Sequence, residues 1–92
     1  MKNNMSYFVY ILLSQKDNKL YVGCTDNPQR RILDHNYGKV LATKNRRPLV
    51  MIHKEEFKSK ADAFNRERFL KTLWSARFKK KILEEYKQSM VK

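Results

Sequence analysis

The run FVYILLSQKDNKLYVG, residues 8–23, constrains most strongly how this chain can fold. Residues 7–13 are aromatic, β-branched or leucine, which is typical of a strand, and the shorter run at 20–23 resumes this pattern after the polar QKDNK. Two strands joined by so short a turn predict a β-hairpin. A loop with an even number of residues places Tyr10 and Tyr21 on the same face, because side chains alternate along a strand.

The segment after the hairpin predicts a short helix bounded by Asn27 and Gly38. Asn27 is a favoured N-cap residue, Pro28 suits the first helical position, and Gly38 suits the C-terminal cap. Arg31 and His35 lie four residues apart, so we expect both to project from the same side of this helix.

The middle of the chain predicts a loop and a third strand. Residues 39–47 predict an exposed basic loop, and Pro48 precedes a strand that ends near Phe57. His53 is two residues after Met51 in that strand, so we expect the two to share a face and His53 to be a packing or surface histidine.

The last third of the chain predicts two helices. Ser59 and Asp62 have capping-box spacing, which predicts a helix over about 60–74, and Ser75 is a candidate cap for a third helix. The expected inward stripe of the first of these helices is Ala63, Glu67, Leu70 and Trp74. The expected buried side of the last helix is Phe78, Ile82, Leu83, Tyr86 and Met90.

The order of elements, β-β-α-β-α-α, predicts an α+β fold in which helices flank a small antiparallel three-stranded β-sheet. A chain of 92 residues is short for more than one core, so we expect a single domain over residues 1–92. The single cysteine, Cys24, cannot form an internal disulfide, and no zinc-ligand spacing is present. We therefore expect a cytoplasmic protein without a membrane segment.

Lysine and arginine outnumber aspartate and glutamate by 21 to 9, giving a net charge of +12. A small body with so much charge of one sign favours a polyanionic partner, most simply nucleic acid. A solvated face without a partner is the ordinary alternative. The candidate nucleic-acid-binding residues are Lys44, Arg46, Arg47, Lys71 and Lys79.

Four features point towards chemistry: the two tyrosines on one face, Arg31 with His35, Glu67 in an apolar stripe, and the basic surplus. Singly, each has an ordinary explanation, such as packing tyrosines or a carboxylate paired with Arg66 or Arg68. Together they match what phosphodiester hydrolysis requires, namely a base, a cation for the phosphate and a carboxylate for a metal. A tyrosine base needs neighbouring cations to lower its pKa, and Arg31 and the metal are expected to do so.

The motifs resemble those of the GIY-YIG nuclease family, and within it the small stand-alone, UPF0213-like members. The matching motifs are FVY at 8–10, YVG at 21–23, and RERFLK at 66–71, with Arg31 and His35 ten and fourteen residues after Tyr21. Phe8 and Val9 replace the glycine and isoleucine of the family's first motif, and no asparagine follows Asn65, where many members carry a late one. The resemblance covers roughly residues 6–75.

The resemblance implies a role for each matched position. Tyr10, helped by His35, would be the general base, Arg31 would contact the scissile phosphate, and Tyr21 would lie beside it as a hydrogen-bonding group. Glu67 would be the only protein ligand of one divalent ion, Mg²⁺ or Mn²⁺. The glycine at position 23 would allow close approach to the site. Hydrolysis would leave a 3′-hydroxyl and a 5′-phosphate.

The function expected from the resemblance is a metal-dependent DNA endonuclease that acts in repair, in recombination or on unusual DNA structures. One alternative is a non-catalytic nucleic-acid-binding module with a degenerate site. A second is a small basic protein that works by binding a protein partner, which a nuclease of this size could also need for targeting. We expect a monomer or a weak dimer.

Overall fold

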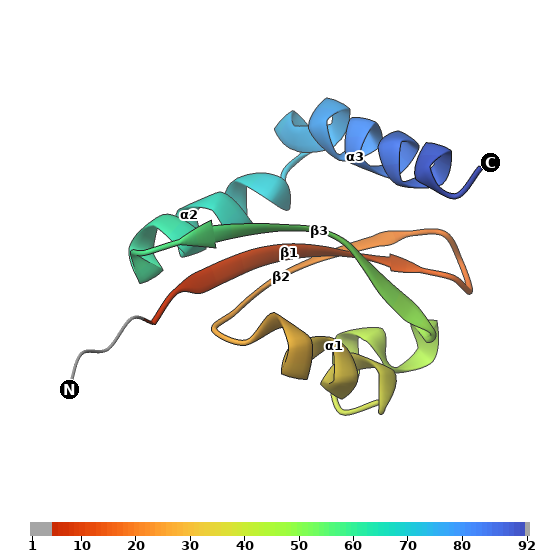
Figure 1. The fold of residues 1–92 in the computed structure, drawn as a ribbon, viewed down its shortest axis with the longest axis horizontal. Helices are drawn as coiled ribbons and strands as arrows, with labels where there is room; N and C mark the ends of the chain where they lie inside the picture. Colours follow the sequence, from red (N-terminus) through yellow and green to blue (C-terminus); the bar gives the residue numbers. More distant parts are fainter. Residues whose placement is uncertain (1–4, 92) are drawn as a thin grey trace.

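The computed structural model describes residues 5–91 and contains a three-stranded antiparallel β-sheet in the order β2-β1-β3. Helix α1 and the 3₁₀ helix η1 lie on one face of the sheet, and α2 and α3 lie on the other (Figure 1). The elements are β1 (Tyr7–Ser14), β2 (Leu20–Thr25), α1 (Pro28–Asn36), η1 (Leu41–Arg46), β3 (Leu49–Phe57), α2 (Lys60–Leu70), the short 3₁₀ turn η2 (Leu73–Ser75) and α3 (Ala76–Ser89). The predicted α+β fold class and its order of strands and α-helices are confirmed.

The central strand β1 sends alternate side chains into two small cores, because successive residues of a strand point to opposite faces. The buried residues of the core under α2 are Val9, Ile11, Val22, Ala63 and Leu70. The buried residues of the core on the α1 face are Tyr10, Leu12 and Leu49. A tyrosine therefore belongs to the core between the sheet and α1, where its hydroxyl must find a polar partner.

The hairpin forms as the sequence predicts. Ser14 and Lys19 close a four-residue loop through a backbone hydrogen bond, and Asn18 adopts a positive φ of 61°, a conformation that asparagine tolerates. The register pairs Leu12 with Tyr21. The side chain of Tyr21 consequently lies on the same face as that of Tyr10, as expected.

Helix α1 also begins and ends where the sequence indicates. The Asn27 side chain accepts a hydrogen bond from the amide of Arg30, and Pro28 occupies the start of the helix. After the last turn, Gly38 has φ +80°, the left-handed conformation that glycine adopts without strain. The helix thus holds His35 against the sheet, where this side chain is fully buried.

Strand β3 departs from regular pairing with β1, and this overturns one expectation. Ile11 pairs with His53, but Leu12 pairs with Met51, so Ile52 is an additional residue that forms a bulge. His53 and Met51 therefore face opposite sides of the sheet, not the same side. The His53 ring packs edge-on against an aromatic ring of α3, which agrees with a packing role.

Two further expectations are wrong, one about the loop at residues 39–47 and one about the helix after Ser59. Residues 39–47 are not simply an exposed loop, because η1 forms within them and Thr43 is fully buried. The helix expected over about 60–74 ends at Leu70, where the Ser75 hydroxyl donates to the Leu70 carbonyl and closes the chain into a turn. Trp74 is consequently 88% exposed and does not extend the buried stripe.

Helix α3 is less buried than its pattern predicts. Its inward residues are only partly covered, and none of the α3 residues from Ala76 to Ser89 is buried. Met90 follows the helix and is 65% exposed. No helix within residues 5–91 has both the length and the hydropathy to cross a membrane.

Candidate functional site

The site begins with a close approach between Tyr10 of β1 and Gly23 of β2, which pair directly in the sheet. The phenol ring of Tyr10 lies over the glycine, and a Cβ at position 23 would overlap the phenol oxygen and Cζ. The missing side chain at Gly23 therefore lets the phenol pass across β2, an edge strand, while Tyr10 stays 99% buried. A glycine is required here because of space, not because of backbone conformation.

His35 of α1 contacts both tyrosines. Its Nε2 lies 2.9 Å from the Tyr10 hydroxyl oxygen, and the two rings meet edge-on at 5.8 Å between centroids. The Tyr21 ring packs edge-on against the same imidazole at 5.2 Å. Three side chains from β1, β2 and α1 thus form one cluster, as the shared face of the hairpin led us to expect.

Thr43 of η1 completes this cluster and was missed by the sequence analysis. Its Oγ1 lies 2.7 Å from Nδ1 of His35 and 3.5 Å from the carbonyl oxygen of Val40. Both ring nitrogens of the buried imidazole therefore have partners. A threonine in a polar segment carries no signal of burial, because only the packing of η1 onto α1 places it there.

The electrostatics of the cluster keep both titratable groups uncharged at neutral pH. Burial and the Arg31 guanidinium lower the pKa of His35 to about 4. Burial also raises the pKa of Tyr10, more than the nearby Arg31 lowers it. Arg31 by itself therefore does not lower the pKa of Tyr10 below its usual value, because desolvation outweighs the attraction of the guanidinium.

Arg31 lies on α1 beside the phenol and is partly exposed, with its Nη1 3.9 Å from Asp34 Oδ2. It is one of the residues that line an open cavity of about 270 Å³ between the end of β2 and α1. The cavity is lined by Cys24, Thr25, Asp26, Asn27, Arg30, Arg31 and Asp34. A guanidinium at the wall of a cavity next to Tyr10 can contact a phosphate that enters from solvent.

Glu67 comes from α2, on the other face of the sheet, and acts on Tyr10 and Cys24 through its charge. Its carboxylate contributes to the raised pKa of Tyr10 after burial and the effect of Tyr21, and it also raises the pKa of Cys24 beyond the effect of burial. The carboxylate is 3.1 Å from Lys71 Nζ. The alternative that Glu67 pairs with Arg66 or Arg68 is therefore wrong, because its partner is Lys71.

The expected nucleic-acid-binding residues do not form a single patch. Lys44, Arg46 and Arg47 belong to η1 and its end, whereas Lys71 and Lys79 belong to the α2–α3 layer. Arg46 is engaged by Asp17 at 3.3 Å and by the Leu20 carbonyl oxygen, so it is not a free cation. A nucleic acid would meet two separate basic regions, one on each layer.

The donor set fits a single hard divalent cation. Within residues 5–91, no three His, Cys, Asp or Glu side chains cluster to form a metal site. Mg²⁺ does not need such a cage, because it keeps several waters and binds proteins through one or two carboxylates and substrate phosphate oxygens. The partly exposed Glu67 carboxylate acts electrostatically on Cys24, which lines the cavity beside Arg31, so it is the carboxylate that would hold such an ion.

Comparison with known proteins identifies a nuclease-type domain. The GIY-YIG catalytic domain family matches residues 6–82, so the chain belongs to the GIY-YIG family. Proteins of this family are hydrolases that act on nucleic acid.

The relatives are small proteins of similar length. A UPF0213 protein of Staphylococcus haemolyticus is 46% identical over 80 residues, covering 86% of this chain and 95% of the relative. A UPF0213 protein of Enterococcus faecalis is 40% identical over 76 residues, covering 79% and 85%. The solution NMR structure of a UPF0213 protein from Bacillus halodurans superimposes with a TM-score of 0.53 at 36% identity, over 87% of this chain and 84% of that one.

Proposed function

We propose that this protein is a metal-dependent endonuclease that hydrolyses phosphodiester bonds in DNA, in repair, in recombination or in the processing of unusual DNA structures. The observation that carries the proposal is the contact between the Tyr10 hydroxyl and Nε2 of a neutral, buried His35. Membership of the GIY-YIG family supports it. A phenol that is hydrogen-bonded to a neutral imidazole can transfer its proton to that imidazole.

The proton arrangement in the network follows from its partners. If the Thr43 hydroxyl donates to the Val40 carbonyl, its oxygen accepts from Nδ1–H of His35. Nε2 then carries a lone pair and accepts from the protonated Tyr10. In this arrangement Tyr10 would take a proton from the attacking water while its own proton passes to Nε2 of His35, so the imidazole is the final proton acceptor.

The other side chains act on the phosphate. Arg31 would hold the scissile phosphate and stabilise the negative charge that develops on it. Tyr21, fixed against the imidazole, would direct its hydroxyl towards the same group. Glu67 would hold one divalent ion, Mg²⁺ or Mn²⁺. When bound, such an ion acts as a Lewis acid that stabilises negative charge on the phosphate and on the leaving oxygen.

A plasmid-nicking assay with a titration of Mg²⁺ and Mn²⁺ tests the proposal. Wild type is expected to convert supercoiled plasmid to the nicked form only with metal, and Glu67→Gln and Arg31→Ala are expected to lose at least about 100-fold in rate. Both variants should still bind DNA with strong salt dependence. Glu84→Gln, an exposed α3 carboxylate, is the matched control and should nick as wild type does.

One observation favours a non-catalytic nucleic-acid-binding module as the second candidate. Lys71 neutralises the carboxylate that would hold the metal, at 3.1 Å. If purified wild type nicks no duplex, branched or single-stranded DNA with either metal but binds it in a salt-dependent manner, this second function replaces the first.

A further inference from the structure

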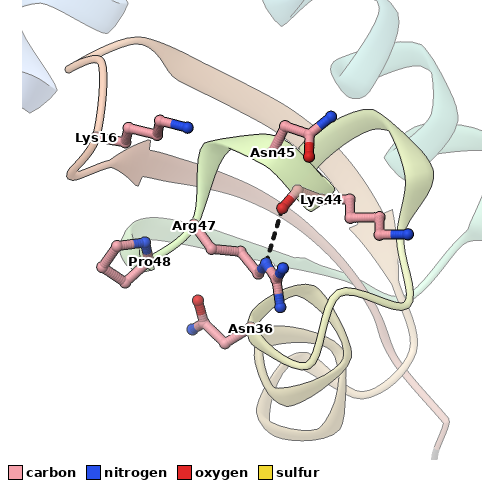
Figure 2. Close-up of a pocket in the computed structure, with 6 residues that line it drawn as sticks. All are labelled: Lys16, Asn36, Lys44, Asn45, Arg47 and Pro48. Atoms are coloured by element: carbon pink, nitrogen blue, oxygen red, sulfur yellow. Dashed lines mark hydrogen bonds between the residues drawn. The ribbon is translucent and has the colours of Figure 1, made fainter.

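A second cavity, wide open to solvent and with a volume of about 430 Å³, lies on the other side of the wall that η1 and α1 form next to the site. Figure 2 shows that its side chains come from three separate segments: the turn after β1, the end of α1, and η1 with the residues that follow it. They are Lys16, Asn36, Lys44, Asn45, Arg47 and Pro48. No residue of this cavity lines the cavity beside Arg31.

The cavity is positively charged and contains no acidic side chain. Among residues 5–91, no ion pair joins Lys16, Lys44 or Arg47 to a carboxylate. The nearby Asp17 is instead paired with Arg46. Three uncompensated cations around one concave surface attract an anion, and phosphate oxygens accept hydrogen bonds from all of them.

The arginine of the cavity is held in place before any ligand arrives. Arg47 Nε donates to the Lys44 carbonyl oxygen at 2.7 Å, as Figure 2 shows. The same guanidinium lies against Gly38, where a Cβ would be 2.8 Å from Nη1 of Arg47. A planar donor that is already oriented loses little conformational freedom on binding an anion.

The cavity and the candidate active site share one wall. Asn36 lines the cavity, and its chain neighbour His35 points into the site. In the same way, Lys44 lines the cavity while Thr43 contacts the imidazole. Asn36 fixes this wall to β3, because its side chain accepts from the Leu49 amide at 2.8 Å and donates to the Leu49 carbonyl at 2.9 Å.

We infer that this cavity binds a backbone phosphate of the nucleic-acid substrate, distinct from the phosphate that is cleaved. The inference rests on the proposed function for the identity of the polyanion. The substrate strand then crosses the α1–η1 wall, from the Tyr10 site to the turn that carries Lys16. The substrate is accordingly a polynucleotide that extends beyond the cleaved bond on this side, and Arg46 takes no part in holding it.

The test compares two double variants that change the net charge equally. Lys16→Glu with Lys44→Glu alters the cavity, and Lys81→Glu with Lys87→Glu alters exposed lysines of α3, in the opposite layer. Binding of a fluorescein-labelled DNA duplex is measured by anisotropy over a range of NaCl concentrations, without divalent metal. Urea unfolding of both variants, whose altered lysines are exposed, is expected to match wild type.

The cavity variant is expected to bind at least about 10-fold more weakly, with a salt dependence reduced by about one unit of slope for each lost phosphate contact. The α3 variant should lose less affinity, because it changes only the general field. Equal loss in both variants, or no loss in the cavity variant, would overturn the inference.

A second arm distinguishes a strand phosphate from a small phosphorylated ligand. Inorganic phosphate is titrated into ¹⁵N-labelled protein, and shifts of the Lys44, Asn45 and Arg47 amides are expected only at about millimolar concentrations, whereas the DNA duplex moves the same amides at far lower concentrations. Saturation by micromolar phosphate with no response to DNA would overturn the assignment to a strand. If wild type nicks DNA but the cavity variant binds DNA as wild type does, only this inference is wrong. If the cavity variant loses affinity but wild type does not nick DNA, only the proposed hydrolysis is wrong.

Discussion

The hydroxyl oxygen of Tyr10 lies 2.9 Å from Nε2 of His35, although 25 residues separate them along the chain. The contact exists because the phenol crosses Gly23 without obstruction and because α1 turns His35 towards the sheet. Both side chains are buried, so each provides the hydrogen-bond partner that water would otherwise provide to the other.

Replacing Gly23 with alanine is expected to displace the Tyr10 phenol, because the added Cβ would overlap its oxygen and Cζ. Overpacking of this kind costs about 1–3 kcal/mol of unfolding free energy, and nicking should fall with it. Urea unfolding and plasmid nicking measure the two effects. In a Tyr10→Ala background the same glycine substitution should cost almost nothing, and a full cost there would show that the overlap is not the cause.

Thr43→Val should disturb the imidazole, whereas Thr43→Ser should not, because serine keeps the hydroxyl that contacts Nδ1. Valine leaves a buried ring nitrogen without a partner, which costs about 1–3 kcal/mol. We expect ¹⁵N NMR to show the Nδ1–H tautomer in wild type and in Thr43→Ser only, and the pH profile of nicking to change only in the valine variant. An Nε2–H tautomer in wild type would contradict the proton arrangement proposed here.

The unfolding free energy is expected to fall as the pH is lowered through the range between the usual histidine pKa and the folded-state value of His35. The pKa of His35 is lowered from 6.5 to about 4 by burial first and by Arg31 second. Between these values the unfolded chain binds the proton and the folded chain does not, so acidification favours unfolding. The loss from this residue amounts to about 3 kcal/mol between about pH 7.5 and pH 4.

Urea unfolding of wild type and of His35→Gln over this pH range measures that loss. The variant removes the titration of His35 and retains the other titrating groups, so the two curves should converge towards acid pH. Parallel curves would show that His35 takes up its proton equally in both states.

Trp74→Ala is expected to change the unfolding free energy by less than about 0.5 kcal/mol, because the side chain is 88% exposed. Leu70→Ala, four residues earlier and fully buried, should cost about 2–5 kcal/mol. The emission of Trp74, the only tryptophan, should be that of a solvated indole in the native protein. A blue-shifted native spectrum or a large cost at Trp74 would mean that the residue is covered.

The sequence was sufficient for the features that local chemistry decides. The hairpin, its even loop and the shared face of the two tyrosines follow from strand alternation and a short turn. The start of α1 follows from the N-cap at Asn27. Each depends on residues close together in the chain, so the pattern carries the information.

The sequence was not sufficient where contacts between distant segments decide. It placed Trp74 in a continuous helix, but the Ser75 hydroxyl ends that helix by bonding to Leu70. It also gave Thr43 no role, because the residue becomes a partner of His35 only when η1 packs on α1.

The amino-acid sequence by itself determined the elements, their order and the family motifs, because hydrophobic periodicity and capping are local properties. Only the tertiary structure decided the charge state of the site. Burial, which no local pattern reports, outweighs the Arg31 guanidinium at Tyr10 and keeps the phenol protonated. At His35, burial and the same guanidinium act together and keep the imidazole neutral.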